Sequence, residues 1–477
     1  MVGGACVEQW DRADPLASAR GRWVLAVTVL GSAIALLETT VINVSLPAIG
    51  RDLDADLAGL QWVVSGYLVT LASLILLGGA LGDRFGRRRI FELGVIGFTI
   101  ASLTCALSPT VEVLIAARLA QGIGGALLTP GSLAIIEGTF RREDRARAIG
   151  SWSALGGIAA AVGPLLGGWL VDAVSWRAIF LLNLPIGIVV IWASRRHVPE
   201  TRDEEQSGRL DVLGSILVTG GLAGLTFALI RASERGAASP EVVAAAVVAV
   251  LALALFVVVE RRSANPMLPL EIFRSRQFTG ANLVTFAVYA ALGGVSFLLA
   301  VFLQISLGYS AVQAGAATLP VTALMLALAS RMGALAQRIG PRIPLTVGSL
   351  LLAAGTALMS GIDIGDSYVT SVLPGVVVFG LGLASVVAPV TATVLAAAAD
   401  RHAGVASGVS NAVARTAALM AVAALPLIAG LSSSDYDDPE VFADGFDTAM
   451  LVMAALAAVG GVLAFVTIRE NILEQSE

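Results

Sequence analysis

Residues 79–88 read GALGDRFGRR and residues 333–342 read GALAQRIGPR, so that six of the ten positions are identical. A second pair of similar stretches is GIGGA at 122–126 and GLGLA at 380–384. The two members of these pairs lie 254 and 258 residues apart. Two similarities at nearly the same spacing indicate that the chain consists of two related halves.

The sequence around these repeats is strongly apolar. Hydrophobic residues make up 57% of the chain and charged residues 14%, with a mean hydropathy of +0.85. Soluble proteins carry about 25% charged residues, and a soluble domain could not bury this much apolar surface. The chain must therefore use lipid as its solvent, which excludes a cytosolic enzyme, a nucleic-acid-binding protein and a disordered scaffold.

Apolar runs long enough to cross a bilayer recur along the whole chain. A membrane-spanning helix needs about 20 mostly apolar residues. Fourteen stretches meet this requirement, at 23–46, 61–81, 90–108, 112–137, 148–172, 176–194, 211–230, 241–259, 279–303, 313–333, 343–361, 370–396, 404–430 and 447–468. The first is too long for a cleaved signal peptide and leads into a second span after a short loop. We therefore expect an all-α integral membrane protein with 14 transmembrane helices.

The two halves do not account for all of these helices. Six runs precede residue 200 and six follow residue 278, so the pair at 211–230 and 241–259 looks like an insertion. We predict an N-terminal six-helix bundle at 1–200, two inserted helices at 201–260 and a C-terminal six-helix bundle at 261–477. Duplicated halves are typical of secondary transporters, whose substrate site lies between the halves near the membrane midplane.

All 30 basic residues are arginines, and their positions predict the orientation in the membrane. With the N-terminus in the cytoplasm, 24 arginines fall in inner segments and 4 in outer segments. Cytoplasmic loops of membrane proteins carry an excess of basic residues, which favours this orientation. Because the number of spans is even, the C-terminus is also expected in the cytoplasm.

Metal and disulfide chemistry have few residues to draw on. The chain has two cysteines, Cys6 and Cys105, and two histidines, His197 and His402, with neither a CxxC nor an HExxH motif. This composition predicts no disulfide framework and no metal site. No span carries a nucleophile with a matching base, so a membrane-embedded enzyme is not expected.

The first half contains three stretches with the form of transporter motifs: GALGDRFGRRR at 79–89, LIAARLAQGIGGA at 114–126 and GGIAAAVGPLLGG at 156–168. In this order they resemble the cytoplasmic loop signature, the fourth-helix motif and the fifth-helix antiporter motif of the major facilitator superfamily. The motifs occur in the family's order, and the resemblance covers nearly the whole chain.

Three further stretches resemble one branch of this family, the fourteen-helix drug/proton antiporters. They are LLETTVINVSLP at 36–47, LQWVVSGYLVT at 60–70 and WRAIFLLNLPIG at 176–187. The chain departs from the branch at Glu38, where Asp is often found. The resemblance implies a proton-coupled efflux antiporter of the cell membrane that exports amphipathic drug-like compounds by alternating access. It implies small molecules, protons and lipid as partners, no nucleic acid, no obligate protein partner, and no cofactor, the proton gradient being the energy source.

Two other functions share many of these features. A dedicated exporter of one endogenous metabolite or antibiotic would carry the same motifs. A channel would also cross the membrane many times, but the duplicated halves and the GPxxGG motif at 163–168 argue against a continuous pore.

Two charged residues within the spans of the first half are candidates for proton coupling. Glu38 lies in the first span, where a carboxylate is costly and a group that alternates between neutral and charged forms suits coupling. Arg118 would act on this acid through its field, because an arginine keeps its own proton; the alternative is a purely structural ion pair. We expect the helix face of Arg118 to line the cavity. Its other members by helical spacing are Gln121, Gly122, Gly125 and Thr129.

Polar or amphipathic residues within the spans are candidates for substrate contact. In the first half these are Asn43, Tyr67 and Gln121. Each can instead form a hydrogen bond between helices. Arg415, in the thirteenth span, is either a charge in the cavity or the partner of an acid.

The loop after the second span is expected to act as a cytoplasmic gating loop, as the family resemblance implies. Its residues are Gly79, Asp83, Arg84, Gly86 and Arg87. Gly86 permits a tight turn, Asp83 can cap the following helix, and Arg87 can pair with Glu137 at the inner end of the fourth span. The alternative is that the arginines only set the topology.

The fifth span carries the antiporter motif as a stripe of small residues with a proline. The motif residues are Gly156, Gly163, Pro164, Gly167 and Gly168. Small residues let helices approach closely, and proline interrupts the hydrogen-bond ladder. We expect a hinge or tight seam that helps to close the outer side, and plain helix packing is the alternative.

Overall fold

The computed structural model describes residues 15–202, 210–263, 266–398, 403–433 and 438–473. Within these residues the regular structure is helical and contains no strand. Together the helical segments form 14 helices that are long and apolar enough to cross a membrane, which confirms the predicted all-α fold with 14 spans. Cys6 and His402 lie outside the described residues.

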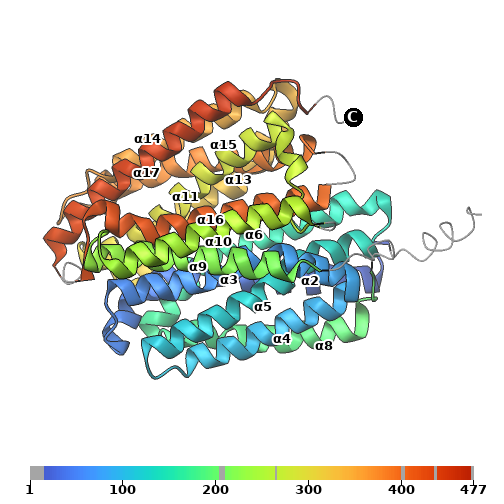
Figure 1. Ribbon diagram of the computed structural model, residues 1–477, viewed down its shortest axis with the longest axis horizontal. Helices are drawn as coiled ribbons and strands as arrows, with labels where there is room; N and C mark the ends of the chain where they lie inside the picture. Colours follow the sequence, from blue (N-terminus) through green and yellow to red (C-terminus); the bar gives the residue numbers. More distant parts are fainter. Residues whose placement is uncertain (1–14, 203–209, 264–265, 399–402, 434–437, 474–477) are drawn as a thin grey trace, which may run out of the picture.

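The helices are long and run nearly parallel to one another (Figure 1). The first half comprises α2 (Ala19–Leu53), α3 (Leu57–Phe85), α4 (Arg87–Ala106), α5 (Val111–Thr139), α6 (Arg142–Ala173), α7 (Arg177–Leu181) and α8 (Asn183–His197). It is followed by α9 (Val212–Arg235) and α10 (Pro240–Arg262). The second half comprises η1 (Leu270–Arg274), α11 (Arg276–Ile305), α12 (Ala311–Ala317), α13 (Leu319–Ile339), α14 (Arg342–Met359), η2 (Tyr368–Val372), α15 (Leu373–Ala396), α16 (Ala403–Ala429) and α17 (Pro439–Thr467). Three spans are each made of two consecutive segments, namely α7 with α8, α12 with α13, and η2 with α15.

The helices extend beyond the apolar runs seen in the sequence. The run at 23–46 belongs to α2, which begins where the Ser18 hydroxyl accepts a hydrogen bond from the Gly21 N–H. The same helix ends at Asp54, whose φ of 51° is left-handed. A hydropathy profile detects only the apolar, membrane-embedded part of a helix. The helix itself continues until a cap satisfies the backbone groups at its end.

The two halves repeat the same helix–helix contacts. In the first half, α5 packs against α3 and α4, and α2 packs against α6. In the second half, α15 packs against α13 and α14, and α11 packs against α16. Equivalent helices therefore have equivalent neighbours, as the internal duplication in the sequence leads us to expect.

The repeated glycine motif makes the same close contact in each half. A Cβ atom on Gly124 would lie 2.6 Å from the backbone nitrogen of Phe98, and one on Gly382 would lie 2.4 Å from that of Leu352. No side chain fits at such distances, so glycine alone allows α5 to cross α4, and α15 to cross α14, this closely. The similarity between GIGGA and GLGLA reflects one packing requirement that occurs twice.

The two additional helices lie along the junction between the halves (Figure 1). α9 packs against α10, against α3 of the first half and against α16 of the second half. α10 exposes many apolar side chains, and Val247, Val248 and Leu251 are each more than half exposed. Such a surface suits contact with lipid. The division of the chain into 1–200, 201–260 and 261–477 stays a prediction.

Apolar exchanges on the exposed side of α10 are expected to have little effect. Val247→Leu, Val248→Leu and Leu251→Val change side chains that are more than half exposed, and lipid offers no complementary surface that they must fit. The unfolding temperature of each variant in detergent should equal that of the wild type. The rate of transport, the activity that the sequence leads us to expect, should also be unchanged. A changed substrate preference in these variants would show that α10 takes part in the substrate site.

Single cysteines in the arginine-rich loops are expected to be inaccessible from outside intact cells. The loops concerned are 141–147, 195–209 and 261–277, whereas cysteines at 432–446 should react, because basic loops stay in the cytoplasm. The measurement is labelling with a membrane-impermeant maleimide in a variant lacking both native cysteines, with permeabilised cells as the control. Reaction of cysteines at 195–209 from outside would contradict the predicted topology.

Candidate functional site

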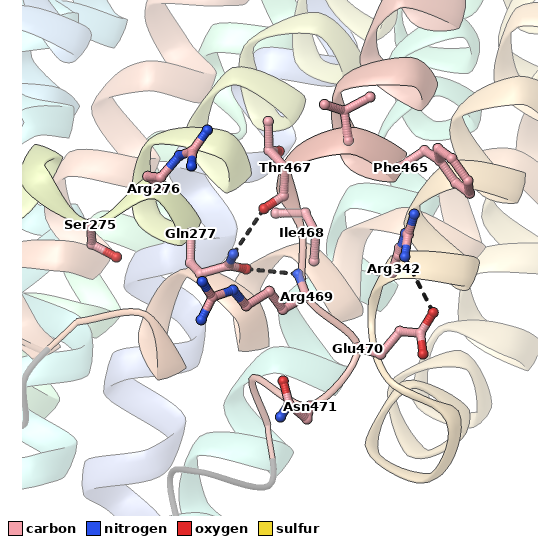
Figure 2. Close-up of a pocket in the computed structure, with 11 residues that line it drawn as sticks. Ser275, Arg276, Gln277, Arg342, Phe465, Thr467, Ile468, Arg469, Glu470 and Asn471 are labelled. Carbon is pink, nitrogen blue, oxygen red and sulfur yellow. Dashed lines mark hydrogen bonds and ion pairs between the residues drawn. The ribbon is translucent and has the colours of Figure 1, made fainter.

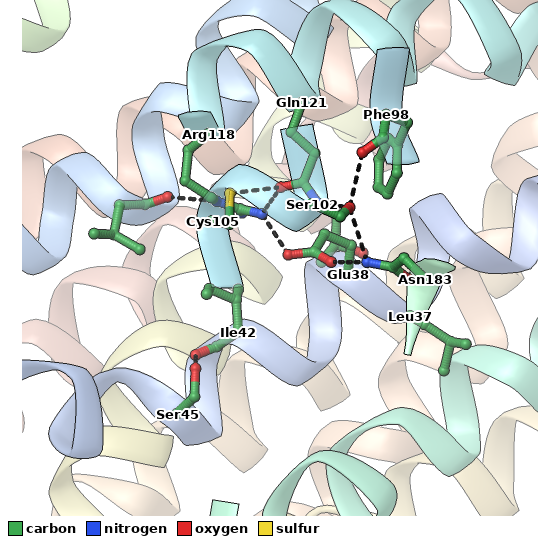
Figure 3. Close-up of polar contacts among 12 residues, drawn as sticks. Leu37, Glu38, Ile42, Ser45, Phe98, Ser102, Cys105, Arg118, Gln121 and Asn183 are labelled. Carbon is green, nitrogen blue, oxygen red and sulfur yellow. Dashed lines mark hydrogen bonds and ion pairs between the residues drawn. The ribbon is translucent and has the colours of Figure 1, made fainter. Parts of the chain in front are cut away.

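A buried ion pair occupies the interior of the first half. The Nη1 atom of Arg118 on α5 lies 2.5 Å from the Oε1 atom of Glu38 on α2. Both side chains are almost fully enclosed, with 1% of Arg118 and 3% of Glu38 exposed. The sequence predicted that these two residues act as a pair, and the structure places them in direct contact (Figure 3).

Hydrogen bonds from four helices surround this pair (Figure 3). Arg118 donates to the Gln121 side-chain oxygen at 2.6 Å and, through Nε, to the carbonyl oxygen of Val63 at 2.9 Å. Asn183 on α8 donates to the second oxygen of Glu38 at 2.9 Å and to the Ser102 hydroxyl at 3.2 Å. The Gln121 amide donates to the same hydroxyl at 2.9 Å. Each oxygen of the carboxylate therefore has a donor.

These contacts explain how two charges can remain in an apolar interior. Removing both ions from water is costly, and their attraction offsets that cost only when further hydrogen bonds complete the site. Loss of one partner from a buried pair typically costs about 3–5 kcal/mol, because the other charge is left without compensation. The Glu38–Arg118 pair is therefore both a structural link and a sensitive point for a change of charge.

The expectation that the Arg118 face lines the cavity is wrong. Arg118 is fully buried, and its guanidinium points at Glu38 inside the first half. On the same face, a Cβ atom on Gly122 would lie 2.3 Å from the carbonyl oxygen of Tyr67, and one on Gly125 would lie 3.1 Å from the Tyr67 hydroxyl. The face packs against α3, because Arg118 finds its counter-ion within the half and has no need of water.

The three predicted substrate residues lie in different surroundings. Gln121 is fully buried in the hydrogen-bond network. The Tyr67 ring lies beneath the guanidinium of Arg118, 4.7 Å from its carbon to the ring centre. The Tyr67 hydroxyl and the side-chain oxygen of Asn43 are buried without a hydrogen-bond partner among the described residues. Their roles in substrate binding stay predictions, with Asn43 and Tyr67 offering free polar atoms and Gln121 offering none.

Two residues of the network were not singled out in the sequence. Asn183 lies within the quoted WRAIFLLNLPIG stretch, and Ser102 lies in the third apolar run. An amide within the apolar run at 176–194 was the available signal, because a buried amide needs a partner within the protein. The serine carried no such signal, since a serine hydroxyl can bond to its own helix, as Ser102 also does to the Phe98 carbonyl at 2.8 Å.

The predicted gating loop forms a tight turn between α3 and α4. Gly86 adopts a φ of 110°, which confirms that the turn requires glycine. Asp83 does not cap α4 as expected, because its carboxylate accepts a hydrogen bond from Arg87 Nε at 2.8 Å. Arg87 also donates to the Ala134 carbonyl oxygen at 3.0 Å. The expected direct pair between Arg87 and Glu137 is therefore not formed, since the nearer Asp83 takes its place.

The other loop residues lie close to this turn. A Cβ atom on Gly79 would lie 3.7 Å from Pro130 on α5, and the guanidinium of Arg84 lies over the ring of Phe85 at 5.3 Å. Glu200, after α8, accepts a hydrogen bond from the backbone of Arg88 at 3.0 Å. The segment after α8 therefore helps to hold the turn, and the loop is anchored within its own half.

The glycines of the antiporter motif form a seam between α6 and α2. A Cβ atom on Gly163 would lie 2.3 Å from the Thr40 hydroxyl, and one on Gly167 would lie 2.4 Å from Val41. Gly156 contacts Leu36 less tightly, with a Cβ distance of 3.2 Å. The motif thus holds α6 directly against the helix that carries Glu38, which is the close approach expected from a stripe of small residues.

The last glycine of the motif faces the other half of the molecule. A Cβ atom on Gly168 would lie 2.4 Å from the carbonyl oxygen of Ala311 on α12. On that helix, a Cβ atom on Gly315 would lie 2.2 Å from the carbonyl oxygen of Pro164. α6 and α12 therefore touch backbone to backbone at the end of the molecule opposite the arginine-rich loops.

Hydrogen bonds join the halves at this same end. Gln304 on α11 donates to the Val44 carbonyl oxygen of α2 at 3.0 Å. The backbone N–H groups of Ala311 and Val312 donate to the Asp172 carboxylate at 3.1 and 2.9 Å. Between described residues, the two halves are thus joined at the end that the arginine distribution predicts to be outside, which we call the outer end.

A cavity lies away from all of these residues (Figure 2). Its volume is about 820 Å³, and it lies where α11 and α14 begin and α17 ends. Arg276, Arg342 and Arg469 line it, and Arg342 lies 3.4 Å from Glu470. This cavity belongs to the arginine-rich end of the second half and includes none of the predicted site residues.

Two bundles with repeated contacts, which touch along α3 and α16 and at the outer end, and of which the first encloses a buried ion pair, define a polytopic membrane protein with the architecture of a secondary transporter. The chain belongs to the Major Facilitator Superfamily, whose family model matches residues 28–422. Proteins of this family and fold are transporters rather than enzymes.

Curated relatives cover most of the chain. It is 38% identical over 411 residues to the methylenomycin A resistance protein of Streptomyces coelicolor, covering 85% of each chain. It is 36% identical over 401 residues to the tetracenomycin C resistance and export protein of Streptomyces glaucescens, covering 83% of this chain and 74% of that one. It is 35% identical over 389 residues to the multidrug resistance protein Stp of Mycobacterium tuberculosis, covering 81% and 72%.

Solved transporter structures share the fold. A POT family transporter crystallised with a thioalcohol-conjugated peptide aligns with a TM-score of 0.70 at 16% identity, covering 96% of this chain and 98% of that chain. A bacterial homologue of the human lysosomal transporter Spinster, crystallised inward-facing and unoccupied, aligns with a TM-score of 0.67 at 15% identity, covering 97% and 99%. At these identities the likeness concerns the fold alone.

Proposed function

We propose that the protein is a proton-coupled antiporter that exports amphipathic drug-like compounds across the cell membrane. The observation that carries this proposal is the Glu38–Arg118 pair, an intramembrane acid 2.5 Å from a permanent cation and shielded from solvent. Such an acid inside a membrane protein suits the uptake and release of a proton. The names of the relatives, which are resistance and export proteins, support an outward direction for the cargo.

A proton on Glu38 would loosen the helix that carries it. With Glu38 ionised, α2 is attached to α5 through Arg118 and to α8 through Asn183. Protonation removes the charge attraction, while Arg118 keeps its bonds to Gln121 and to the Val63 carbonyl. α2 also carries Val44, which accepts the hydrogen bond from Gln304 across the halves. One helix therefore connects the proposed proton site with the contact that closes the outer end.

Alternating access follows from this connection. The described structure is joined at the outer end, which corresponds to the state that takes substrate from the cytoplasm. When that end opens, a proton from outside neutralises Glu38 and favours release of the substrate, and its loss to the cytoplasm restores the pair. A membrane potential of 100 mV contributes about 2.3 kcal/mol for each charge moved.

A second candidate is the export of one endogenous metabolite or antibiotic. The relatives include proteins named for a single antibiotic, methylenomycin A or tetracenomycin C, as well as one named for multidrug resistance. The proton-coupling machinery would be the same in both cases, and the two candidates differ only in the number of compounds carried.

Growth of an efflux-deficient bacterial host tests the proposed function. Expression of the chain should raise the tolerated concentration of at least some amphipathic inhibitors, and a protonophore at a sub-inhibitory concentration should abolish this gain. Resistance to many unrelated compounds would favour the drug exporter, and resistance to one would favour the dedicated exporter. Resistance that persists after collapse of the proton gradient would contradict proton coupling.

A further inference from the structure

Arg415 lies near the middle of α16 and is half-buried. Among the described residues it has no acidic partner and no hydrogen bond. An arginine at this depth of a membrane is costly, and such residues usually face a protein interior or an aqueous cavity where they act on ions or substrates. Arg118, by contrast, is fully compensated by Glu38. The second half thus carries an uncompensated positive charge that the proton site does not explain.

Contacts along α16 place Arg415 at the junction of the halves. The Gln61 amide of α3 donates to the Val422 carbonyl oxygen at 2.8 Å, and a Cβ atom on Gly408 would lie 2.8 Å from Leu76. α3 and α16 run in opposite directions along the membrane, so these two contacts put Arg415 level with Tyr67. Arg415 is also within electrostatic range of the Tyr67 hydroxyl, which is buried without a hydrogen-bond partner.

Ala414, the residue before Arg415, lines a small polar cavity of the second half. A Cβ atom on Gly293 of α11 would lie 2.7 Å from Ala418 of α16, which sets Tyr289 level with Ala414. Tyr289 and Ala414 line a cavity between α11, α15 and α16, and Arg415 is within electrostatic range of the Tyr289 hydroxyl. The cavity is also lined by polar side chains, including Thr285, Thr391, Ser407, Ser410 and Asn411.

Among the described residues of the first half, Glu38 is the acid that lies deep in a span, and it is not available to a positively charged substrate. Glu38 is 3% exposed, and its two oxygens accept hydrogen bonds from Arg118 and Asn183. A cation next to Arg415 would therefore meet the positive charge of the guanidinium, and the carboxylate of Glu38 would not be free to compensate it. The electrostatics favour an anion.

We propose that Arg415, together with Tyr289 and Asn411, binds the acidic group of the substrate, so that the exported compounds are amphipathic organic anions such as carboxylates. A guanidinium presents paired N–H donors that match the two oxygens of a carboxylate. Hydroxyl and amide groups beside it supply further donors, and the apolar helix surfaces accommodate the rest of the molecule. This assignment rests on the proposed export function and specifies the substrate class for it.

The assignment has an electrical consequence. Export of a monovalent anion in exchange for one inward proton moves two positive charges inward per cycle. Transport should therefore respond to the membrane potential even without a pH difference, whereas exchange of a monovalent cation for one proton would be electrically silent.

Binding of three matched probes to the purified full-length chain tests the assignment without any proton gradient. The probes share a dansyl group and an undecyl chain and end in a carboxylic acid, a primary amide or an amine. Energy transfer from the protein's tryptophans to the dansyl group reports binding. The wild type should bind the acid most tightly. Arg415→Gln should weaken binding of the acid by about tenfold or more, because a charge-assisted pair is lost, and leave the amide nearly unchanged.

Two control variants separate substrate binding from a structural role. Arg415→Lys should recover part of the affinity for the acid, and Arg274→Gln, which removes an exposed arginine of η1, should have no effect. The unfolding temperature of Arg415→Gln should equal or exceed that of the wild type, since no partner loses its counter-charge.

Three results would overturn the assignment: tightest binding of the amine by the wild type, equal binding of acid and amide, or unchanged binding of the acid by Arg415→Gln. Proton coupling can fail in liposomes while the acid still binds through Arg415. Conversely, proton-coupled transport of the amine probe would support the proposed export function and contradict the assignment of an anionic substrate.

Discussion

Glu38→Gln is expected to reduce uptake driven by a pH gradient to the level of protein-free liposomes. Glutamine preserves the size of the side chain and a carbonyl acceptor for Arg118, but it carries no exchangeable charge. The variant should fold, because Arg118 keeps its bonds to Gln121 and to the Val63 carbonyl oxygen. It should also bind substrate, because the acidic group of the substrate is assigned to Arg415.

The measurement is transport into liposomes that contain the reconstituted protein under an imposed pH gradient. Glu38→Asp serves as the matched control, since it keeps the charge but withdraws the carboxylate from Arg118 by one methylene, and it should retain part of the rate. Energy-independent exchange of labelled substrate should survive in Glu38→Gln, because that step needs no net proton movement. Gradient-driven uptake at the wild-type rate by Glu38→Gln would place the coupling proton elsewhere.

Valine at Gly168 or Gly315 is expected to abolish transport by keeping the outer end open. A Cβ atom at these positions would lie 2.4 Å from the Ala311 carbonyl oxygen or 2.2 Å from the Pro164 carbonyl oxygen. These neighbours are backbone atoms, which cannot turn aside as a side chain can. The joined state seen here would therefore become inaccessible, while each half could still fold.

Accessibility of a cysteine at Val44 tests this expectation directly. Val44 is 2% exposed in the joined state, so Val44→Cys should react slowly with an impermeant maleimide and much faster when combined with Gly168→Val. Gly220→Val is the control, since a Cβ atom there meets nothing within 4 Å. Normal transport by Gly168→Val, with Val44→Cys still protected, would show that the seam between α6 and α12 is not a gate.

Hydropathy was sufficient to predict the number of spans and the all-α fold. Lipid cannot satisfy backbone hydrogen bonds, so a long apolar run has to form a helix whatever its neighbours are. The two similar stretches at 79–88 and 333–342 likewise predicted a repeated arrangement, because equal packing requirements select equal residues. The glycine pair Gly124 and Gly382 shows one such requirement at atomic distances.

The sequence also identified the two members of the central ion pair, since a charge within an apolar run is conspicuous. Only the tertiary structure decided which way Arg118 points, that Asn183 and Ser102 complete its network, and that Arg87 bonds to Asp83 rather than to Glu137. The physical reason is that a membrane helix is apolar on all sides, so its sequence carries little information about its rotation. Rotation is set by close contacts between helices, such as those of Gly163 with Thr40, and these bring together residues far apart in the chain.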